Sequence, residues 1–252
     1  MEIEFLGTGT STGVPQIGCK CATCCSSDMR DNRLRTSAIV RTGKHNILID
    51  CGPDFRTQML RTSNQWLDAL LVTHSHYDHV GGLDDLRPYC FDGPFPVYAQ
   101  DNVINDIKAR LPYCFKENLY PGVPTFKMIK ADSTHPIDLN GEIIQPIPIW
   151  HYKLLINGYK IGNLAYITDA KTIDEEVIES LKGIKVLVIN ALRIRPHLSH
   201  ISLSESLEII GRIKPQRAYL IHLSHDMGLH ENVSKLLPAN VSIAYDGLKV
   251  EI

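Results

Sequence analysis

Residues 69–79 read Ala69-Leu-Leu-Val-Thr-His74-Ser-His76-Tyr-Asp78-His79, so an apolar segment leads directly into three histidines and an aspartate. The apolar segment predicts a buried strand, and the four polar side chains follow at its end. While the chain stays extended, His74 and His76 point to the same side, and a helical turn directs Asp78 and His79 together to a second point. Stability alone gives little reason for three imidazoles and a carboxylate here. The loop therefore predicts metal ligands, and its two directions allow it to serve two ions.

Six residues are too few to complete two coordination shells, so we expect the remaining ligands at the ends of other strands. Three residues fit this expectation, because each directly follows an apolar run that should be buried: His151 after Ile147–Trp150, Asp169 after Leu164–Thr168, and His222 after Ala218–Ile221. The repetition of one pattern supports all three as ligands of the same centre.

A second group of metal-binding side chains is predicted near the N-terminus, where Cys19-Lys-Cys21-Ala-Thr-Cys24 supplies three thiols. A structural zinc ion requires four such ligands in a closed tetrahedron, so one is missing locally. His225, three residues after His222, is the first candidate for the fourth ligand, and Cys25 is its competitor.

The composition is that of a soluble globular protein, with 252 residues, 44% hydrophobic residues and a formal net charge of −2. The first residues lack the basic and apolar regions of a signal peptide, and no apolar run is long enough for a membrane helix, so we expect a cytoplasmic protein without a membrane partner. The balanced charge disfavours nucleic acid as a partner, because it provides no general attraction for phosphate. Seven cysteines, an odd number, favour metal binding over a disulfide framework in that compartment.

Hydrophobic patterning predicts one domain over residues 1–252, built from two mixed sheets flanked by helices, with a cysteine-rich zinc loop at about residues 18–26. Strands are expected at Ile3–Leu6, Ser37–Val40, Asn46–Ile49, Ala69–Val72, Pro96–Tyr98, Thr125–Ile129, Ile143–Ile149, Tyr159–Ile167, Lys185–Ile189, Ala218–Ile221, Val241–Ala244 and Lys249–Ile252. Helices are expected at Asp54–Arg61, Asp101–Arg110, Ile173–Leu181, Ser202–Ile213 and Asn232–Leu236. Asp246-Gly247 predicts a two-residue turn and therefore an antiparallel hairpin at the end of the chain.

The order His-x-His-x-Asp-His, a later histidine, a strand-end aspartate and a C-terminal histidine resembles the metallo-β-lactamase superfamily, over nearly the whole chain. This resemblance implies an α/β fold, a four-layer αββα sandwich with a dinuclear site at one edge of the sheets. It implies one ion on His74, His76 and His151, a second on Asp78, His79 and His222, and Asp169 bridging the two. It also implies that Asp50 orients a ligating imidazole, although a helix N-cap or a turn is the alternative role for this aspartate.

A narrower resemblance is to the phosphoribosyl cyclic phosphate phosphodiesterase of phosphonate degradation and its relatives. The motifs that carry it are spread along the chain: Gly7-Thr-Gly9, Gly13-Val-Pro15, the three cysteines, Arg35-Thr-Ser37, Gly82-Leu-Asp-Asp-Leu-Arg87, His222-Leu-Ser-His225 and Tyr245-Asp-Gly247. This resemblance implies that His200 is the general acid, just ahead of a helix for which Ser202 is the expected N-cap. His197, close by, is expected to be structural or peripheral. A relative in pyrroloquinoline quinone biosynthesis shares the cysteine pattern, so the pattern does not fix the substrate.

Two divalent ions, zinc or manganese, can hold a bridging hydroxide that attacks phosphorus, and a separate zinc ion would be structural. We therefore expect a metal-dependent hydrolase, a phosphodiesterase that cleaves a small cyclic or nucleotide-like phosphodiester. The alternatives are a nuclease of the ribonuclease Z type and a non-hydrolytic biosynthetic helper like the quinone-cofactor relative. The substrate would be the main partner, and the sequence is also compatible with a homodimer.

Overall fold

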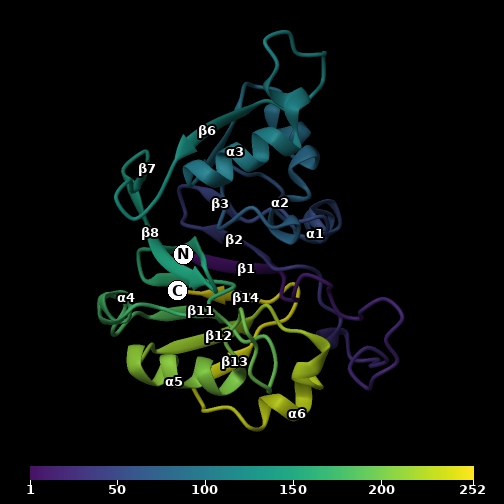
Figure 1. Cartoon of the computed structure of the whole chain (residues 1–252), viewed down its shortest axis with the longest axis vertical. Helices are drawn as coiled ribbons and strands as arrows, with labels where there is room; N and C mark the ends of the chain where they lie inside the picture. The colour runs from purple at the N-terminus through teal and green to yellow at the C-terminus, as the bar shows by residue number, and fades with distance from the viewer.

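The computed structural model describes residues 1–252 and contains two seven-stranded mixed sheets (Figure 1). The first sheet, in spatial order, consists of β14 (Lys249–Glu251), β1 (Glu2–Gly7), β2 (Ser37–Arg41), β3 (Asn46–Ile49), β4 (Ala69–Leu71), β5 (Phe95–Ala99) and β6 (Phe126–Lys130). The second consists of β13 (Val241–Ile243), β12 (Arg217–Ile221), β11 (Val186–Asn190), β10 (Leu164–Ile167), β9 (Leu154–Ile161), β8 (Glu142–His151) and β7 (Ile137–Leu139). Each sheet is antiparallel over one half and parallel over the other, because strands β3 to β6 and β10 to β13 run parallel.

Helices cover the outer face of each sheet, at opposite ends of the molecule in Figure 1. The helices on the first sheet are α1 (Phe55–Arg61), α2 (Tyr77–Val80), the 3-10 helices η2 (Leu83–Cys90) and η3 (Pro112–Phe115), and α3 (Asp101–Arg110). The others are η1 (Met29–Asp31), α4 (Glu175–Ser180), α5 (Leu203–Ile213), η4 (His225–Met227) and α6 (His230–Ser234). All of them fall short of the length or apolarity that crossing a bilayer requires. The predicted αββα sandwich is confirmed.

The strands are apolar on both faces because each face enters a different core. Ala38 and Val40 of β2 lie in the core between the sheets, whereas Ile39 lies in the core under α1 and α3. In the second sheet, Tyr166 of β10 lies between the sheets and Ile167 lies under α4 and α5. Since successive side chains of a strand point to opposite faces, continuous apolar runs are what a sheet in the middle of such a sandwich requires.

Most predicted elements occur within two residues of their expected bounds. The segment Tyr159–Ile167 was predicted as one strand, but it contains the end of β9 and all of β10, which pair antiparallel. The turn between them includes Gly162, whose φ of 52° lies in the left-handed region that glycine adopts easily. The predicted N-cap Ser202 is confirmed, because its backbone N–H donates a 2.6 Å hydrogen bond to Oε2 of Glu205 at the start of α5.

The predicted hairpin at Asp246-Gly247 is wrong, because β13 and β14 belong to different sheets. The Asp246 carboxylate accepts hydrogen bonds from the hydroxyl of Thr8 at 2.8 Å and from the backbone N–H of Leu34 at 2.7 Å. The N–H of Gly247 donates to the carbonyl of Phe5 at 2.7 Å. The predicted two-residue turn itself is present, since the N–H of Leu248 donates a 3.0 Å hydrogen bond to the carbonyl of Tyr245. Its polar groups also bind the N-terminal segment, so the turn leads the chain from one sheet to the other and does not form a hairpin.

Replacement of Asp246 should consequently destabilise the fold. In Asp246→Ala, Thr8 and Leu34 lose their acceptor, and the buried guanidinium of Arg33 loses a nearby negative charge. We expect the free energy of unfolding to fall by about 2–3 kcal/mol, the usual cost of leaving such groups unpaired. Urea denaturation measures the change, and Glu208→Ala, an exposed carboxylate on α5, serves as the control. A change no larger than that of the control would show that the crossing does not depend on Asp246.

Candidate metal centre

The predicted ligands meet because several strands end at the same edge of the sandwich. In the second sheet β8, β10 and β12 run in one direction and lead into His151, Asp169 and His222. In the first sheet β4 leads into His74. The Tyr159 hydroxyl on β9 donates a 2.6 Å hydrogen bond to the carbonyl of Val72, and the Asn157 N–H donates a 3.0 Å bond to that of Thr73. These two bonds fix the ends of the two sheets against each other.

The first ligand group contains His74, His76, His151 and Asp169, with one possible ligand atom from each lying within 4.8 Å of all the others. Nε2 of His74 is 3.0 Å from Nδ1 of His76 and 3.7 Å from Oδ2 of Asp169. His74, His151 and Asp169 are buried, and His76 is exposed to solvent. The group is therefore open on one side.

The second ligand group contains Asp78, His79, Asp169 and His222, again within 4.8 Å of one another, and all four are buried. Nε2 of His79 lies 3.2 Å from Oδ2 of Asp78 and 3.5 Å from Oδ1 of Asp169. Oδ1 of Asp169 also lies 3.0 Å from Nδ1 of His222. Asp169 thus belongs to both groups and presents a different oxygen to each.

Asp50 and a backbone carbonyl orient two of the imidazoles. Asp50 is fully buried, accepts hydrogen bonds from the N–H and the hydroxyl of Thr73, and has Oδ2 at 2.6 Å from Nδ1 of His79. This contact leaves Nε2 of His79 to face the second ligand group. His151 is held in the same way, with Nδ1 at 2.9 Å from the carbonyl of Ser199. The helix-cap alternative for Asp50 does not apply, since Asp54 occupies the N-cap of α1.

Backbone strain is concentrated at these strand ends. Six residues other than glycine have a positive φ, and three of them are Asp50 at 60°, Asp169 at 54° and His222 at 56°. Such conformations cost about 1–3 kcal/mol each and persist only where the surrounding structure enforces them. The strain supports a functional role for these three positions.

The electrostatics of the second ligand group are those of a cation site. Burial opposes the charged form of His79, but Asp169, Asp50 and Asp78 raise its pKa well above the ordinary value. Burial likewise opposes ionisation of Asp169, but His222 and His79 hold its pKa well below the ordinary value. A proton on His79 therefore balances the negative charge of the neighbouring carboxylates. A metal ion bound to this group would provide the same positive charge.

The geometry fits divalent metal ions. Nε2 of His79 is buried without a hydrogen-bond partner, which is costly for a nitrogen that faces no ligand. Two ligand atoms that each lie 2.0–2.1 Å from one tetrahedral zinc ion are about 3.3 Å apart. Nε2 of His79 lies 3.2 Å from Oδ2 of Asp78 and 3.5 Å from Oδ1 of Asp169, in agreement with that value. The donor set of imidazoles and carboxylates suits zinc and manganese.

The cysteine group is also assembled in the structure. Cys19, Cys21, Cys24 and His225 place one ligand atom each within 4.8 Å, and Nδ1 of His225 lies 3.3 Å from Sγ of Cys19 and 3.4 Å from Sγ of Cys21. Hydrogen bonds from the Cys24 backbone and from His225 lower the pKa of Cys21 to about 6, which favours the thiolate form that binds a metal ion. Cys25 is exposed and lies outside the group.

His200 lies above both ligand groups. Its ring centroid is 4.7 Å from that of His151 and 5.1 Å from that of His222. Its Nδ1 is buried without a hydrogen-bond partner and lies 4.0 Å from Oδ2 of Asp169. His197 is farther out, with Nδ1 accepting a 3.3 Å hydrogen bond from the N–H of Ser199.

Two residues of the site were not singled out from the sequence. The hydroxyl oxygens of Thr10 and Thr36 lie 3.1 and 3.2 Å from the two ring nitrogens of His222. Their only signal was their position inside the N-terminal glycine motif and the Arg-Thr-Ser motif. The carbonyl of Ser199 gave no signal, because every residue carries a carbonyl group.

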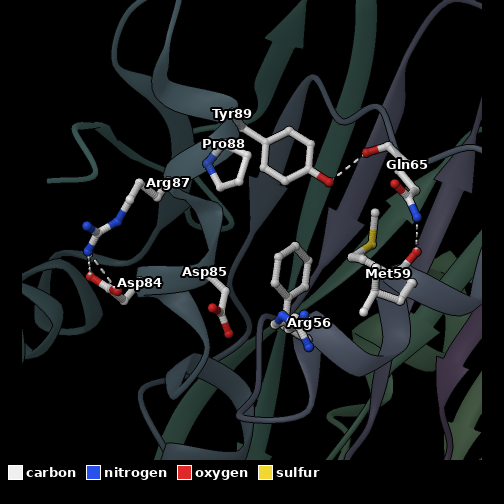
Figure 2. A pocket seen from close by; sticks show the side chains of 10 residues that line it. Arg56, Met59, Gln65, Asp84, Asp85, Arg87, Pro88 and Tyr89 are labelled. Atoms are coloured by element: carbon white, nitrogen blue, oxygen red, sulfur yellow. Dashed lines mark hydrogen bonds and ion pairs between the residues drawn. The ribbon is translucent and has the colours of Figure 1, made fainter. Parts of the chain in front are cut away.

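A separate cavity of about 380 Å³ lies between α1 and η2. Phe55, Met59 and Tyr89 form its apolar wall, and Figure 2 shows Asp85 and Arg56 among the polar side chains that line it. The Tyr89 hydroxyl closes one end by donating a 2.6 Å hydrogen bond to the carbonyl of Gln65. None of the predicted site residues lines this cavity, so it is distinct from the metal centre.

Comparison with known proteins agrees with this geometry. Residues 45–223 match the family described as the β-lactamase superfamily domain. The whole chain is 46% identical to an octanoyltransferase of Porphyromonas gingivalis, but it spans only 52% of that protein's length. It is 23% identical to coenzyme PQQ synthesis protein B of Pseudomonas fluorescens, with both chains fully covered.

The crystal structures that resemble the chain along its whole length include the following two. One is a diphosphatase of the PhnP family, with 38% identity, a TM-score of 0.93 and 97% of that chain covered. The other is zinc-bound PqqB of Methylobacterium extorquens, with a TM-score of 0.80 and full coverage, which at 19% identity shows only the shared fold. The family match, the fold and the two ligand groups therefore place this chain in the metallo-β-lactamase superfamily of metal-binding hydrolases, where it resembles the PhnP family.

Proposed function

We propose that this protein is a dinuclear metal-dependent phosphodiesterase that hydrolyses a small cyclic or nucleotide-like phosphodiester. The observation that carries the proposal is the position of Asp169, whose Oδ1 faces His79 and His222 while its Oδ2 faces His74. One carboxylate between two complete ligand groups is what a two-metal hydrolytic centre requires. The similar PhnP-family protein is a diphosphatase, so attack at phosphorus is a chemistry found on this scaffold.

The groups of the site have separate roles in the proposed reaction. When bound, two divalent ions, zinc or manganese, supply an activated water molecule and stabilise the charge that develops on the phosphate. Asp50 and the Ser199 carbonyl keep the protons of His79 and His151 on Nδ1, so that Nε2 of each ring carries a free electron pair. The exposed side of His76 leaves room for substrate to enter.

We assign proton donation to His200. The oxygen that leaves phosphorus as an alkoxide must be protonated, and His200 stands over both ligand groups with an unpartnered Nδ1. Burial lowers the pKa of His200 to about 3, so the imidazole is neutral in the free site. A bound phosphate anion favours the charged form and opposes this shift, so the imidazole would take up a proton from solvent when substrate binds and pass it to the leaving oxygen.

His200→Ala should therefore reduce turnover in a way that depends on the leaving group. General acid catalysis typically contributes about 10²- to 10⁴-fold, and p-nitrophenolate leaves without a proton. We expect hydrolysis of a ribosyl or alkyl diester to fall by about this factor, with a much smaller change for bis(p-nitrophenyl) phosphate. Metal content should stay constant, and His135→Ala, a histidine in the turn before β7, is the control. Equal losses on both substrates with metal retained would assign His200 to phosphate positioning instead.

A structural zinc ion on Cys19, Cys21, Cys24 and His225 completes the proposal. This ion would link the N-terminal loop to η4, which starts three residues after the site residue His222. The ligands of this site are mainly thiolates, whereas those of the dinuclear groups are imidazoles and carboxylates. This difference in ligand type favours zinc at this position.

Turnover of a substrate panel tests the proposed function. Protein reconstituted with zinc or manganese is assayed with bis(p-nitrophenyl) phosphate, cyclic nucleotides, phosphoribosyl cyclic phosphate and precursor tRNA. Hydrolysis of the small diesters supports the proposal, cleavage of precursor tRNA alone supports the nuclease alternative, and no turnover by fully metallated protein supports the non-hydrolytic helper.

The similarity to an octanoyltransferase favours a second candidate, an activity on octanoyl esters or thioesters. The chain matches 52% of that relative, so the named activity belongs either to the shared half or to the remainder. A centre that activates water could also hydrolyse an acyl thioester. Incubation with an octanoyl thioester and detection of free thiol tests this candidate. Release faster than that by Asp169→Ala protein would support it, and equal rates would exclude it.

A further inference from the structure

His222 presents Nδ1 to the second ligand group, whereas His79, the other histidine of that group, presents Nε2. Nδ1 of His222 lies 3.0 Å from Oδ1 of Asp169. Nε2 of His79 lies 3.5 Å from the same oxygen, and Nδ1 of His79 is in contact with Asp50 at 2.6 Å. A neutral imidazole carries one N–H, so a metal ion on Nδ1 of His222 requires the proton of this ring on Nε2. The group that faces Nε2 of His222 therefore decides whether this tautomer is stable.

The hydroxyl of Thr10 is the group that faces Nε2 of His222. Its oxygen lies 3.1 Å from this nitrogen, and the two residues are only 6% and 1% exposed. Because both residues are buried, an N–H on Nε2 would have no solvent to bind if the hydroxyl were absent. A buried N–H without a partner costs free energy, and a hydroxyl oxygen that accepts its hydrogen bond removes this cost.

Thr36 lies at the other nitrogen of the ring but does not block it. Its oxygen is 3.2 Å from Nδ1 of His222, and its hydroxyl donates a 2.8 Å hydrogen bond to the carbonyl of Gly9. A threonine hydroxyl has one proton, so Thr36 leaves the electron pair of Nδ1 available to a metal ion. The contact that can set the tautomer of His222 is therefore the one with Thr10.

The backbone holds the Thr10 hydroxyl in this place. The Thr10 N–H donates to the carbonyl of Leu223 at 3.0 Å, so Thr10 is attached to the residue that follows His222. On the other side of the same segment, the N–H of Gly9 donates to the carbonyl of Leu34 at 2.8 Å. A side chain in place of Gly9 would not fit, because its Cβ would lie 2.8 Å from a backbone oxygen of that neighbouring segment. The N-terminal glycine motif thus brings a hydroxyl against the imidazole from a segment that is bound on both sides.

We propose that Thr10 is a positioning residue of the second ligand group, whose hydroxyl accepts the Nε2 proton of His222 and so directs the Nδ1 electron pair to a metal ion. This inference rests on the proposed function, in which this group binds metal, and deepens it by giving the N-terminal motif a role there. The N–H of an imidazole that binds a cation is a stronger donor than that of a free ring. The contact with Thr10 therefore stabilises the metal-bound form more than the metal-free form.

Thr10→Val tests the inference, because valine keeps the shape of the side chain and lacks the hydroxyl. Competition with a chromophoric chelator measures the zinc affinities of the purified protein. We expect one active-site ion to bind about 10- to 100-fold more weakly, the usual effect of losing a hydrogen bond to a metal-binding histidine. The other active-site ion and the cysteine-bound ion should be unaffected. Thr10→Ser should retain the wild-type affinity, and Thr57→Val, at an exposed threonine of α1, is the matched control.

The position of the ring proton is a second measurement, which needs no variant. Long-range proton–nitrogen NMR correlation spectra of zinc-loaded wild-type protein show which nitrogen of the assigned His222 ring is protonated. A proton on Nε2 with metal on Nδ1 supports the inference, and the reverse arrangement would overturn it. Equal zinc affinities in Thr10→Val and the wild type, or equal losses in Thr10→Val and Thr10→Ser, would also overturn it.

Both measurements are independent of turnover, so they separate this inference from the proposed function. Wild-type protein that binds two active-site zinc ions with this tautomer but hydrolyses no diester would refute the proposed function and leave the inference intact. Diester hydrolysis by the wild type, with unchanged zinc affinity in Thr10→Val, would refute the inference and leave the proposed function intact.

Discussion

Asp169→Ala protein is expected to bind neither active-site metal ion tightly and to lose phosphodiester turnover, while keeping its fold. Asp169 is the one residue that belongs to both ligand groups, and it is only 2% exposed. Metal ions contribute several kcal/mol of charge stabilisation to such reactions, so we expect kcat to fall by at least about 10³-fold. Elemental analysis and turnover of bis(p-nitrophenyl) phosphate measure the two losses.

Two further variants make this result specific. Asp169→Asn retains the size of the side chain and tolerates the positive φ of 54°, so it separates the loss of charge from backbone strain. Asp92→Ala removes an exposed carboxylate that belongs to neither ligand group and should bind metal normally. Two tightly bound active-site ions in Asp169→Ala would contradict the bridging role, and the two ligand groups would then have to bind metal independently.

Cys21→Ser should produce the second large effect, a loss of one zinc ion per chain with a lower melting temperature. A structural ion contributes directly to folding, because its site does not exist in the unfolded chain. At free zinc about 1,000 times the dissociation constant, binding stabilises by about 4 kcal/mol. For a domain of this size that corresponds to a fall of about 8–16 °C in the melting temperature.

The matched control is Cys25→Ser, because Cys25 is exposed and lies outside the cysteine group. It should change neither the zinc content nor the melting temperature. Loss of zinc in Cys25→Ser but not in His225→Ala would reverse the choice of the fourth ligand. An unchanged zinc content in Cys21→Ser would show that these thiols do not bind the ion.

The sequence by itself determined the sandwich and most of the candidate ligands, because both depend on short-range patterns. Strands buried on two faces appear as continuous apolar runs, as in Asn46–Ile49. The period of a strand places His74 and His76 on one side, and a polar residue after an apolar run marks the edge where parallel strands end. That rule selected His151, Asp169 and His222, which the structure brings together although His151 and His222 lie 71 positions apart in the sequence.

Only the tertiary structure decided which groups pair across the sheets. It placed His225 rather than Cys25 with the three thiols, and it brought Asp50 against His79. It also turned Asp246-Gly247 from an expected hairpin into a crossing between sheets. Local patterns fix the geometry of a strand. Long-range packing selects which strand it pairs with and which donor a given carboxylate or carbonyl binds, because several segments compete for the same hydrogen-bonding groups.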